Sequence, residues 1–309
     1  MRQDKKLKIQ LKEFKQRKEY SILLANSYNR LGKENKYQNT KHCGDFLEFT
    51  QYLKSGQVKL TGANFCKDRL CPQCAKRRSL KVFGQLSLVL QELKQYNYQY
   101  LFCTLTLKNC NLNDLDITLD NISIAFKKFR ESSFFRGKNK QFLGCFKSIE
   151  ITRNHLNGTL HPHVHLLIAV DKYYFSPFNT YYVKSINISD CWRDCLGVDY
   201  NPSCTLNAVK KIKNVTCEVA KYITKGSDFL IKNNDKLTDT LVDIFSNALY
   251  NKRFISYTGC FSKTRKKLKL KDNDNLIDID AINNCDELEY IIKRYRWNIG
   301  LSTYEELKQ

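Results

Sequence analysis

Two β-rich runs separated by one turn dipeptide constrain the fold of this chain more than any other feature. The runs cover residues 143–153 and 161–170, and Asn157-Gly158 lies between them. Asn-Gly is the strongest short-range hairpin signal, because both residues accept the positive φ angles of a tight turn. The sequence therefore predicts an antiparallel strand pair near the middle of the chain.

The second run, HPHVHLLIAV, carries a histidine cluster. Successive strand residues point to opposite faces of a sheet, so His163 and His165 project from the same face. A two-residue turn sets Glu150 opposite His165 and Thr152 opposite His163, which brings Glu150 onto the imidazole face. A register slip of one residue would remove the carboxylate from that face, so this expectation depends on the turn.

Two imidazoles and a carboxylate on one face predict a metal site. This ligand set suits Mg²⁺ or Mn²⁺ bound to a phosphate better than it suits a closed zinc site. His161 lies on the same face by alternation, and we expect it to support a ligand or contact the substrate. An ordinary polar strand face is the alternative, and His161 in particular stays open to a structural role.

A second group of reactive side chains lies in the segment NVTCEVAKYITKG. Its apolar residues recur at intervals of four, which predicts a helix over residues 215–225 that ends at Gly226. Glu218 and Tyr222 are four residues apart and share a second helix face, which Lys225 joins.

Tyrosine is a weak nucleophile near neutral pH because its pKa is about 10. Attack by Tyr222 on a DNA phosphorus would form a phosphotyrosine ester and leave a free 3′-OH, with a metal neutralising the phosphate charge. Lys225 would stabilise the phenolate or hold the phosphate, and Glu218 would act as a general base. The alternative is a surface tyrosine beside an exposed ion pair. The helix alone favours this alternative, and only its combination with the histidine hairpin favours a catalytic Tyr222.

Charge indicates a polyanionic partner. The chain has 52 Lys and Arg against 31 Asp and Glu, a net charge of +21 and a pI near 9.4. An excess of this size is typical of nucleic-acid binding, although a solvated basic surface is the alternative. The densest run after the N-terminal one is expected to contact DNA phosphates, through Lys263, Arg265, Lys266 and Lys267.

The thirteen cysteines include one close group. Cys66, Cys71 and Cys74 follow a C-x4-C-x2-C pattern that favours structural Zn²⁺, with Cys43 as the fourth thiolate. His42 competes with Cys43 for that position, and buried reduced thiols are the alternative. Three other cysteines are expected in the apolar core: Cys103, Cys145 and Cys217.

The expected environment is the cytoplasm. No apolar run approaches the roughly 18 residues of a membrane span. The N-terminal sequence MRQDKKLKIQLKEF lacks the apolar core of a signal peptide. We therefore expect reduced thiols and no membrane partner.

The chain separates by composition into four expected segments. They are a basic arm (1–40), a Cys-rich segment with a helix (41–97), a segment of alternating strands and helices (98–226), and a basic, partly helical C-terminal region (227–309). Periodicity predicts further elements within them: helices over 77–93, 114–132 and 286–295, and a strand over 100–107.

The chain resembles the rolling-circle replication initiators of small Gram-positive plasmids, a Rep family within the HUH endonucleases. The resemblance covers roughly residues 43–226, through FCKDRLCPQCAKRRSLK, FCTLTL, FKSIEITRN, HPHVHLLI, WRDCLGVDYNP and EVAKYITK. It implies an α+β fold, the HUH endonuclease fold, in which helices flank a central antiparallel sheet. The 98–226 segment would then be the nicking domain, between the Cys-rich N-terminal segment and the basic C-terminal region.

The resemblance also implies a reaction. It implies a metal at His163 and His165 with Glu150 as a further ligand, and nicking of the plasmid origin by Tyr222. Glu218 occupies the position of the family's Glu that activates water when replication terminates. The implied partners are double-stranded and single-stranded origin DNA, with a host helicase and polymerase.

Two other functions compete with this interpretation. Another HUH enzyme is the first, but relaxases usually place the tyrosine before the histidine cluster, a single-strand transposase is more often shorter, and here Tyr222 follows the cluster. A non-catalytic, zinc-bearing DNA-binding regulator is the second. It would explain the charge and the cysteines, but not Glu150, His163 and His165 together with Tyr222.

Overall fold

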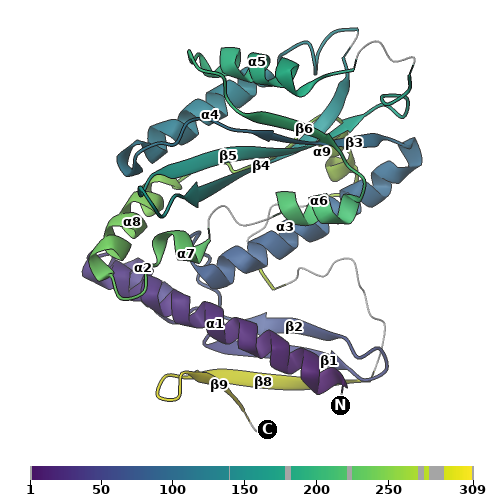
Figure 1. The fold of residues 1–309 in the computed structure, drawn as a ribbon. Helices are drawn as coiled ribbons and strands as arrows, with labels where there is room; N and C mark the ends of the chain where they lie inside the picture. The colour runs from purple at the N-terminus through teal and green to yellow at the C-terminus, as the bar shows by residue number, and fades with distance from the viewer. Residues whose placement is uncertain are drawn as a thin grey trace. The chain divides into compact units, whose positions relative to one another are not determined.

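The computed structural model describes residues 2–138, 140–177, 182–220, 225–270, 275–277 and 289–307. The chain forms two compact units, both drawn in Figure 1. The terminal unit comprises Met1–Gly84, Lys225–Ser246 and Asn273–Gln309, and the central unit comprises Gln85–Thr224 and Asn247–Asp272. The four segments expected from composition are contiguous, whereas both compact units are discontinuous in sequence.

A five-stranded antiparallel sheet forms the middle of the central unit, in the strand order β6-β3-β5-β4-β7. Its strands are β3 (Gln99–Leu105), β4 (Phe142–Arg153), β5 (Leu160–Val170), β6 (Cys204–Ala208) and β7 (Ile255–Tyr257). The expected antiparallel sheet is therefore confirmed. β5 lies in the centre of the sheet, and its residues from Leu166 to Val170 are completely buried.

Helices cover both faces of this sheet. Figure 1 shows α4 (Leu115–Phe129) and α5 (Ser185–Leu196) on one face and α6 (Ile212–Val219) on the other. The α4 helix buries an apolar stripe, including Leu119, Ile122 and Phe126, because these residues recur at helical spacing. Two short 3₁₀ helices, η1 (Lys94–Tyr96) and η2 (Leu112–Asp114), precede β3 and α4.

The β4–β5 hairpin forms as predicted, but its register was predicted wrongly. Glu150 pairs with His163 and Ser148 pairs with His165, and Thr152 lies opposite His161. The pairing is thus shifted by two residues from the expected one. Because side chains alternate with a period of two, an even shift keeps Glu150 on the histidine face.

The turn explains this shift. Asn157-Gly158 does not form a two-residue turn. Instead Asn154 N–H donates to Thr159 O and Gly158 N–H donates to Asn154 O, both at 2.8 Å. The side chain of Asn157 accepts hydrogen bonds from the backbone and the hydroxyl of Thr159. Only Gly158 takes a positive φ, so the connection is longer than the dipeptide suggests.

The terminal unit contains a second antiparallel sheet, in the order β2-β1-β8-β9. Its strands are β1 (Phe46–Tyr52), β2 (Val58–Ala63), β8 (Tyr290–Asn298) and β9 (Thr303–Glu306). The long helix α1 (Arg2–Arg30) packs on it, and residues from helix and sheet form one apolar cluster: Leu7, Phe14, Leu47, Phe49, Leu60 and Tyr295. The expected basic arm is therefore a packed helix, followed by α2 (Glu34–Lys41).

The helix expected over residues 286–295 is wrong from residue 290 onward. Tyr290–Asn298 is a strand that pairs with β1 along its length, from Phe46↔Arg296 to Tyr52↔Tyr290. Tyr295 and Trp297 alternate with exposed residues and are buried. Pairing with a distant strand thus outweighs the local helical pattern. Residues 286–288 lie outside the described part of the chain.

Several helix boundaries differ from those expected. The helix α3 (Pro72–Leu93) begins before residue 77, because Pro fits the first turn of a helix. The helix expected over residues 215–225 is α6, which ends at Val219. Gly226 does not end a helix but begins the short α7 (Gly226–Phe229), and Lys225 stands at its N-cap with extended backbone.

The remaining elements are α8 (Asp235–Ala248), which carries acidic partners of Arg30 in α1 and of Lys33 just before α2, and α9 (Gly259–Lys267). The start of α9 lies against β4 at two glycines. A Cβ on Gly259, whose φ is +54°, would lie 2.2 Å from Leu143 O, and a Cβ on Gly144 would lie 2.5 Å from Thr258 O. Among the residues that the structure describes, no helix combines the length and apolarity needed to cross a membrane.

Candidate functional site

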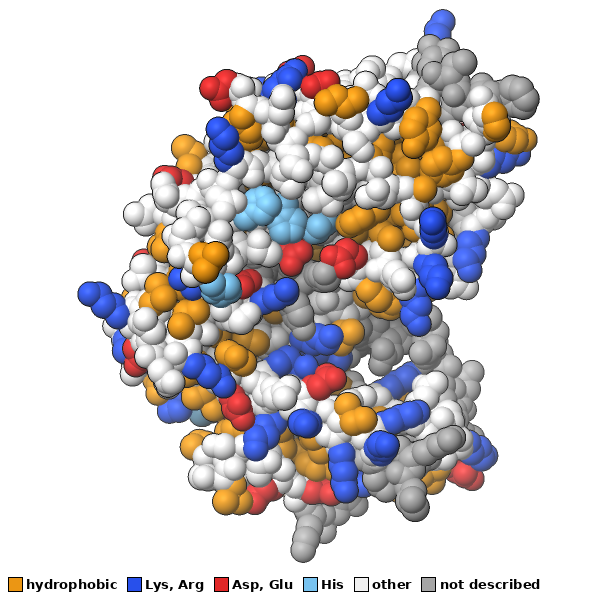
Figure 2. Space-filling model, viewed as in Figure 1, with side chains coloured by type: hydrophobic (Ala, Val, Ile, Leu, Met, Phe, Trp, Pro, Cys, Tyr) orange, Lys and Arg blue, Asp and Glu red, His pale blue; other side chains and the backbone are white. Residues whose placement is uncertain are grey.

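Glu150, His163 and His165 converge on one face of the central sheet. Glu150 Oε2 lies 3.4 Å from His163 Nε2 and 3.2 Å from His165 Nε2. One donor atom from each side chain lies within 4.8 Å of the others. Figure 2 shows histidine side chains gathered on one face of the molecule with acidic side chains beside them. The structure therefore brings together the three ligands expected from the sequence.

The carboxylate of this group is anionic despite its burial. Only 8% of Glu150 and 7% of His165 is exposed. Burial by itself would raise the pKa of Glu150, but hydrogen bonds from His163 and His165, and their charges, outweigh it and hold the pKa below its ordinary value. The site therefore offers an anionic oxygen beside two imidazole nitrogens.

Backbone and hydroxyl groups orient both rings. His163 Nδ1 lies 3.1 Å from His161 O, and since a carbonyl only accepts, Nδ1 of His163 carries a proton. His165 Nδ1 lies 3.2 Å from Thr104 Oγ1 on the neighbouring strand. The ring of His165 also stacks on Phe102, with centroids 5.5 Å apart. These contacts turn both Nε2 atoms toward Glu150.

The donor set fits a divalent cation. Nδ1 of His163 is taken by the carbonyl, so Nε2 faces the Glu150 carboxylate at 3.4 Å, either as an N–H that donates to it or as a lone pair that can bind a metal ion. Lone pairs at this distance repel one another unless a proton or a metal ion lies between them. Imidazole nitrogen with carboxylate oxygen is a common donor combination for first-row and alkaline-earth divalent ions.

His161 acts on this group through its backbone. Its carbonyl accepts the hydrogen bond from His163, and the two rings lie 5.3 Å apart. Burial, and then the charge of His163, lower the pKa of His161. The sequence interpretation, that His161 supports a ligand or contacts substrate, stays a prediction.

Two neighbours of His165 were not predicted from the sequence. Thr104 lies opposite His165 on β3, and Ser148 lies opposite it on β4. Ser148 Oγ is buried and has no hydrogen-bond partner within the described ranges. The correct hairpin register would have revealed Ser148, whereas Thr104 depends on the pairing of β3 with β5.

The helix face predicted to hold Glu218, Tyr222 and Lys225 is described only in part. Glu218 is half-buried on α6, and α6 packs against β5, the strand of the histidines. Tyr222 lies outside the described residues. Lys225 belongs to the terminal unit, and its backbone N–H donates to Asp228 Oδ2 at 3.2 Å. The proximity of Glu218 to Tyr222 therefore stays a prediction.

The four cysteines meet in the terminal unit. The Sγ atom of Cys43 lies 3.5 Å from that of Cys71 and 3.6 Å from that of Cys74, and Cys66 Sγ is 3.6 Å from Cys74 Sγ. His42, which competed with Cys43 in the sequence, turns instead to Asp45, with Nδ1 2.8 Å from Oδ2. The four thiols therefore form a cluster without the imidazole.

The basic run on α9 divides into different environments. Lys263 lines a cavity of about 590 Å³ together with Arg130, Arg136 and Lys140. Lys266 is exposed. Two others have partners: the Arg265 guanidinium lies 5.0 Å from the centroid of the Tyr257 ring, and Lys267 Nζ lies 2.6 Å from Glu92 Oε1.

Fold and site together define the class: a strongly basic α+β protein with antiparallel sheets and two groups of side chains that could hold a metal ion. The chain belongs to the Replication protein family, whose model matches residues 57–304. This confirms the Rep family that the sequence motifs indicated.

Relatives extend over most of the chain. "Protein rep" of Streptococcus pneumoniae serotype 2 is 33% identical over 91% of this chain and 92% of its own length. A "Protein rep" of a Bacillus species is 32% identical over 84% of this chain and 89% of its own length. The "Protein rep" of Bacillus amyloliquefaciens is 28% identical over 95% of this chain and 93% of its own length. No solved structure gives a significant match.

Proposed function

We propose that this protein initiates rolling-circle replication of a plasmid by nicking one strand of the origin and joining it covalently to Tyr222. The observation that carries the proposal is the convergence of Glu150, His163 and His165 in the centre of an antiparallel sheet. Membership of the replication protein family and a charge of +21 support a DNA substrate. We assign the central unit to the HUH endonuclease fold on the same grounds.

The protein's own residues prepare the scissile phosphate. A divalent cation, Mg²⁺ or Mn²⁺, held by the three ligands would neutralise phosphate charge and orient the bond. The carbonyl of His161 and the hydroxyl of Thr104 fix the two rings, so little reorganisation is needed when DNA enters. Glu150 contributes the negative charge of the ligand set.

The proposed nick is a transesterification. The phenol oxygen of Tyr222 attacks the phosphorus, an O–P bond to tyrosine forms, and the bond from phosphorus to the 3′ oxygen breaks. The phenolic proton passes to solvent, and the departing oxygen takes one proton from solvent and ends as a 3′-OH. A host polymerase would extend this end after a helicase separates the strands. Lys225 is assigned to the phenolate or the phosphate, where a cation stabilises the developing charge.

Termination is assigned to Glu218. After one turn of the circle Tyr222 already carries DNA, so the second cleavage needs another nucleophile. Glu218 would take a proton from water, which then attacks the phosphorus and releases the strand by hydrolysis. The packing of α6 on β5 supports this role, since it holds the helix of Glu218 beside the strand of the histidines.

DNA backbone contacts are assigned to the basic cavity and to α9. Of the cavity cations, Arg130, Arg136, Lys140 and Lys263 form no ion pair within the described ranges. Arg130 Nε is buried there without a hydrogen-bond partner. Positive groups that are not paired with a carboxylate attract phosphates and release counterions when DNA binds. Lys266 adds an exposed cation on the same helix, and Arg265 and Lys267 complete the predicted run.

A nicking assay tests the proposal. The protein is incubated with supercoiled plasmid carrying the DNA that flanks its gene, with Mn²⁺, and the products are resolved on a denaturing gel. We expect nicked circles and a protein–DNA adduct, both lost in Tyr222→Phe and retained in the exposed control Tyr250→Phe. An adduct that persists in Tyr222→Phe would overturn the assignment, and so would the absence of nicking by the wild-type protein.

A further inference from the structure

We propose that Cys43, Cys66, Cys71 and Cys74 bind one structural Zn²⁺ as a tetrathiolate, and that buried Lys18 positions the loop of Cys43 for it. This site lies within the terminal unit and does not depend on the nicking chemistry. It would make the metal a condition for the folding of that unit.

Sulfur spacing carries the first step. A tetrahedral zinc site with Zn–S bonds of about 2.3 Å places its sulfurs about 3.8 Å apart. The three Sγ–Sγ distances here are 3.5, 3.6 and 3.6 Å. A disulfide needs about 2.05 Å, so no pair among these is oxidised. Cys43, Cys71 and Cys74 are almost completely buried, and Cys66 is half-buried.

Hydrogen-bond donors point at the sulfurs. The backbone N–H of Cys66 donates to Cys43 Sγ at 3.3 Å, and that of Lys67 donates to Cys74 Sγ at 3.2 Å. Lys67 has a φ of +61°, a conformation that residues other than glycine seldom adopt. The hydroxyl of Ser21 also lies 3.3 Å from Cys71 Sγ, although it donates its proton to Arg17 O at 3.0 Å and is therefore not one of these donors. Neutral thiols are weak acceptors, so this pattern favours thiolates bound to a cation.

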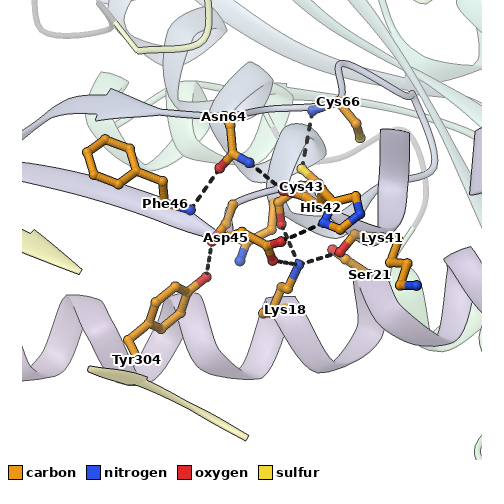
Figure 3. Close-up of polar contacts among 12 residues, drawn as sticks. Lys18, Ser21, Lys41, His42, Cys43, Asp45, Phe46, Asn64, Cys66 and Tyr304 are labelled. Atoms are coloured by element: carbon orange, nitrogen blue, oxygen red, sulfur yellow. Dashed lines mark hydrogen bonds and ion pairs between the residues drawn. The ribbon is translucent and has the colours of Figure 1, made fainter. Parts of the chain in front are cut away.

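Lys18 fixes the loop that carries Cys43. Its side chain is fully buried, although lysine is rarely buried without partners. Nζ donates to Lys41 O at 2.7 Å and to Cys43 O at 3.1 Å, and it pairs with Asp45 Oδ1 at 2.5 Å. Figure 3 shows these contacts meeting at Nζ; Lys41 and Asp45 lie two residues before and after Cys43 in the sequence. The ammonium thus uses all three protons to hold the ligand loop.

The cluster joins segments that are distant in sequence. Cys74 lies in the first turn of α3, whereas Lys18 and Ser21 belong to α1. From β9, the hydroxyl of Tyr304 donates to Gly44 O at 2.7 Å (Figure 3). Since metal binding is coupled to folding in sites of this kind, loss of the ion should loosen the contacts among these segments.

Metal analysis of the full-length protein tests the site. We expect about one zinc per chain after purification without added metal, and little zinc in Cys74→Ser. Cys195→Ser, outside the cluster, serves as the matched control and should keep its zinc. Retention of zinc by Cys74→Ser, or a wild-type protein that stays free of zinc when expressed with ample zinc, would overturn the site.

Cobalt substitution keeps the test independent of how the variants fold. Wild-type protein stripped with a chelator and reloaded with Co²⁺ should show the strong visible absorption of tetrahedral sulfur coordination. Its melting temperature should fall by roughly 10 °C or more without metal. Weak absorption typical of octahedral oxygen ligands, or an unchanged melting temperature, would contradict the proposal.

Lys18 is tested separately as a positioning residue. In competition with a chromogenic chelator, Lys18→Met should bind zinc on the order of ten-fold more weakly than wild type, while its helical circular dichroism is retained when zinc is in excess. Lys18→Arg should recover part of the affinity, and the exposed Lys12→Met on the same helix is the control. Equal zinc affinity in Lys18→Met and Lys12→Met would remove Lys18 from the site.

Discussion

At the scale of single residues, substitutions of the two histidines test whether DNA cleavage and DNA binding depend on different side chains. We expect His163→Ala and His165→Ala to lose nicking while keeping most of their affinity for origin DNA, because we assign the affinity to the basic surface. His155→Ala, in the exposed loop of the hairpin, is the matched control. Gel-shift and nicking assays run side by side decide, and a parallel loss of both activities would count against separate roles.

Lys147 predicts a pH dependence of stability. It lies on β4 with 5% of its surface exposed, 4.7 Å from the centroid of the Phe126 ring. Burial lowers the pKa of Lys147 to about 8, with smaller contributions from nearby charges. Between that pKa and the ordinary value of 10.5, the unfolded chain binds more protons than the folded one. This lysine therefore makes the fold more stable as the pH rises through that window.

Lys147→Met should thus stabilise the protein at pH 7, by roughly 1–2 kcal/mol once the lost contact with the Phe126 ring is subtracted. The gain should shrink as the pH approaches 10.5, where the unfolded chain also loses the proton. Denaturant unfolding at pH 7 and pH 10 measures it, with exposed Lys127→Met as the control. If Lys147→Met were less stable than wild type at pH 7, the prediction would be wrong, because interactions of the buried ammonium would then outweigh the cost of its burial.

Residue chemistry could be inferred from the sequence where it depended on alternation or on close spacing. The strand period placed Glu150 on the histidine face even though the register was wrong, because an error of two residues preserves the face. The cysteine spacing likewise identified the cluster. Cys217, expected in the core, is exposed on α6, because a short amphipathic helix leaves one face in solvent.

At the scale of elements, a substitution of Glu218 on α6 tests the proposed role of this helix in terminating replication. We expect Glu218→Gln to form the initial adduct normally, because we assign that step to Tyr222, but to fail in the hydrolysis that releases the strand. Over-length single strands should then accumulate in a plasmid replication assay. Normal termination by Glu218→Gln would return this residue to the role of a surface carboxylate.

The α9 helix provides a matched pair of lysines. Lys263 lines the basic cavity, whereas Lys267 already pairs with Glu92. We expect Lys263→Ala to weaken DNA binding several-fold and to reduce the slope of log affinity against log salt by about one. Lys267→Ala should change both quantities less. Equal effects of the two substitutions would show that the DNA phosphates do not bind at the basic cavity lined by Lys263.

Elements were predictable where they are local. The strands around the hairpin and the amphipathic α4 follow from periodicity, and their boundaries lie within a few residues of those expected. The strand Tyr290–Asn298 was not predictable, since its partner Phe46–Tyr52 lies far away in sequence. The hairpin register could not be predicted from Asn157-Gly158, because the turn runs from Asn154 to Thr159 and is closed by hydrogen bonds that include the Asn157 side chain.

For the whole molecule, the two compact units divide the proposed work. The central unit holds the His–His–Glu group, and the terminal unit holds the cysteine cluster. The pairing of β1 with β8 joins the N-terminal and C-terminal parts of the chain within the terminal unit. Composition could not reveal this arrangement, because sequence segments of one character belong to different units.

The central claim is that Tyr222 becomes linked to a 5′ phosphate, and peptide mapping tests it most directly. Wild-type protein is reacted with a labelled origin strand and Mn²⁺, digested with nuclease and trypsin, and analysed by tandem mass spectrometry. The account predicts a nucleotide-phosphate adduct whose fragments locate it on Tyr222. An adduct located on another residue, or nicking without any adduct, would contradict it.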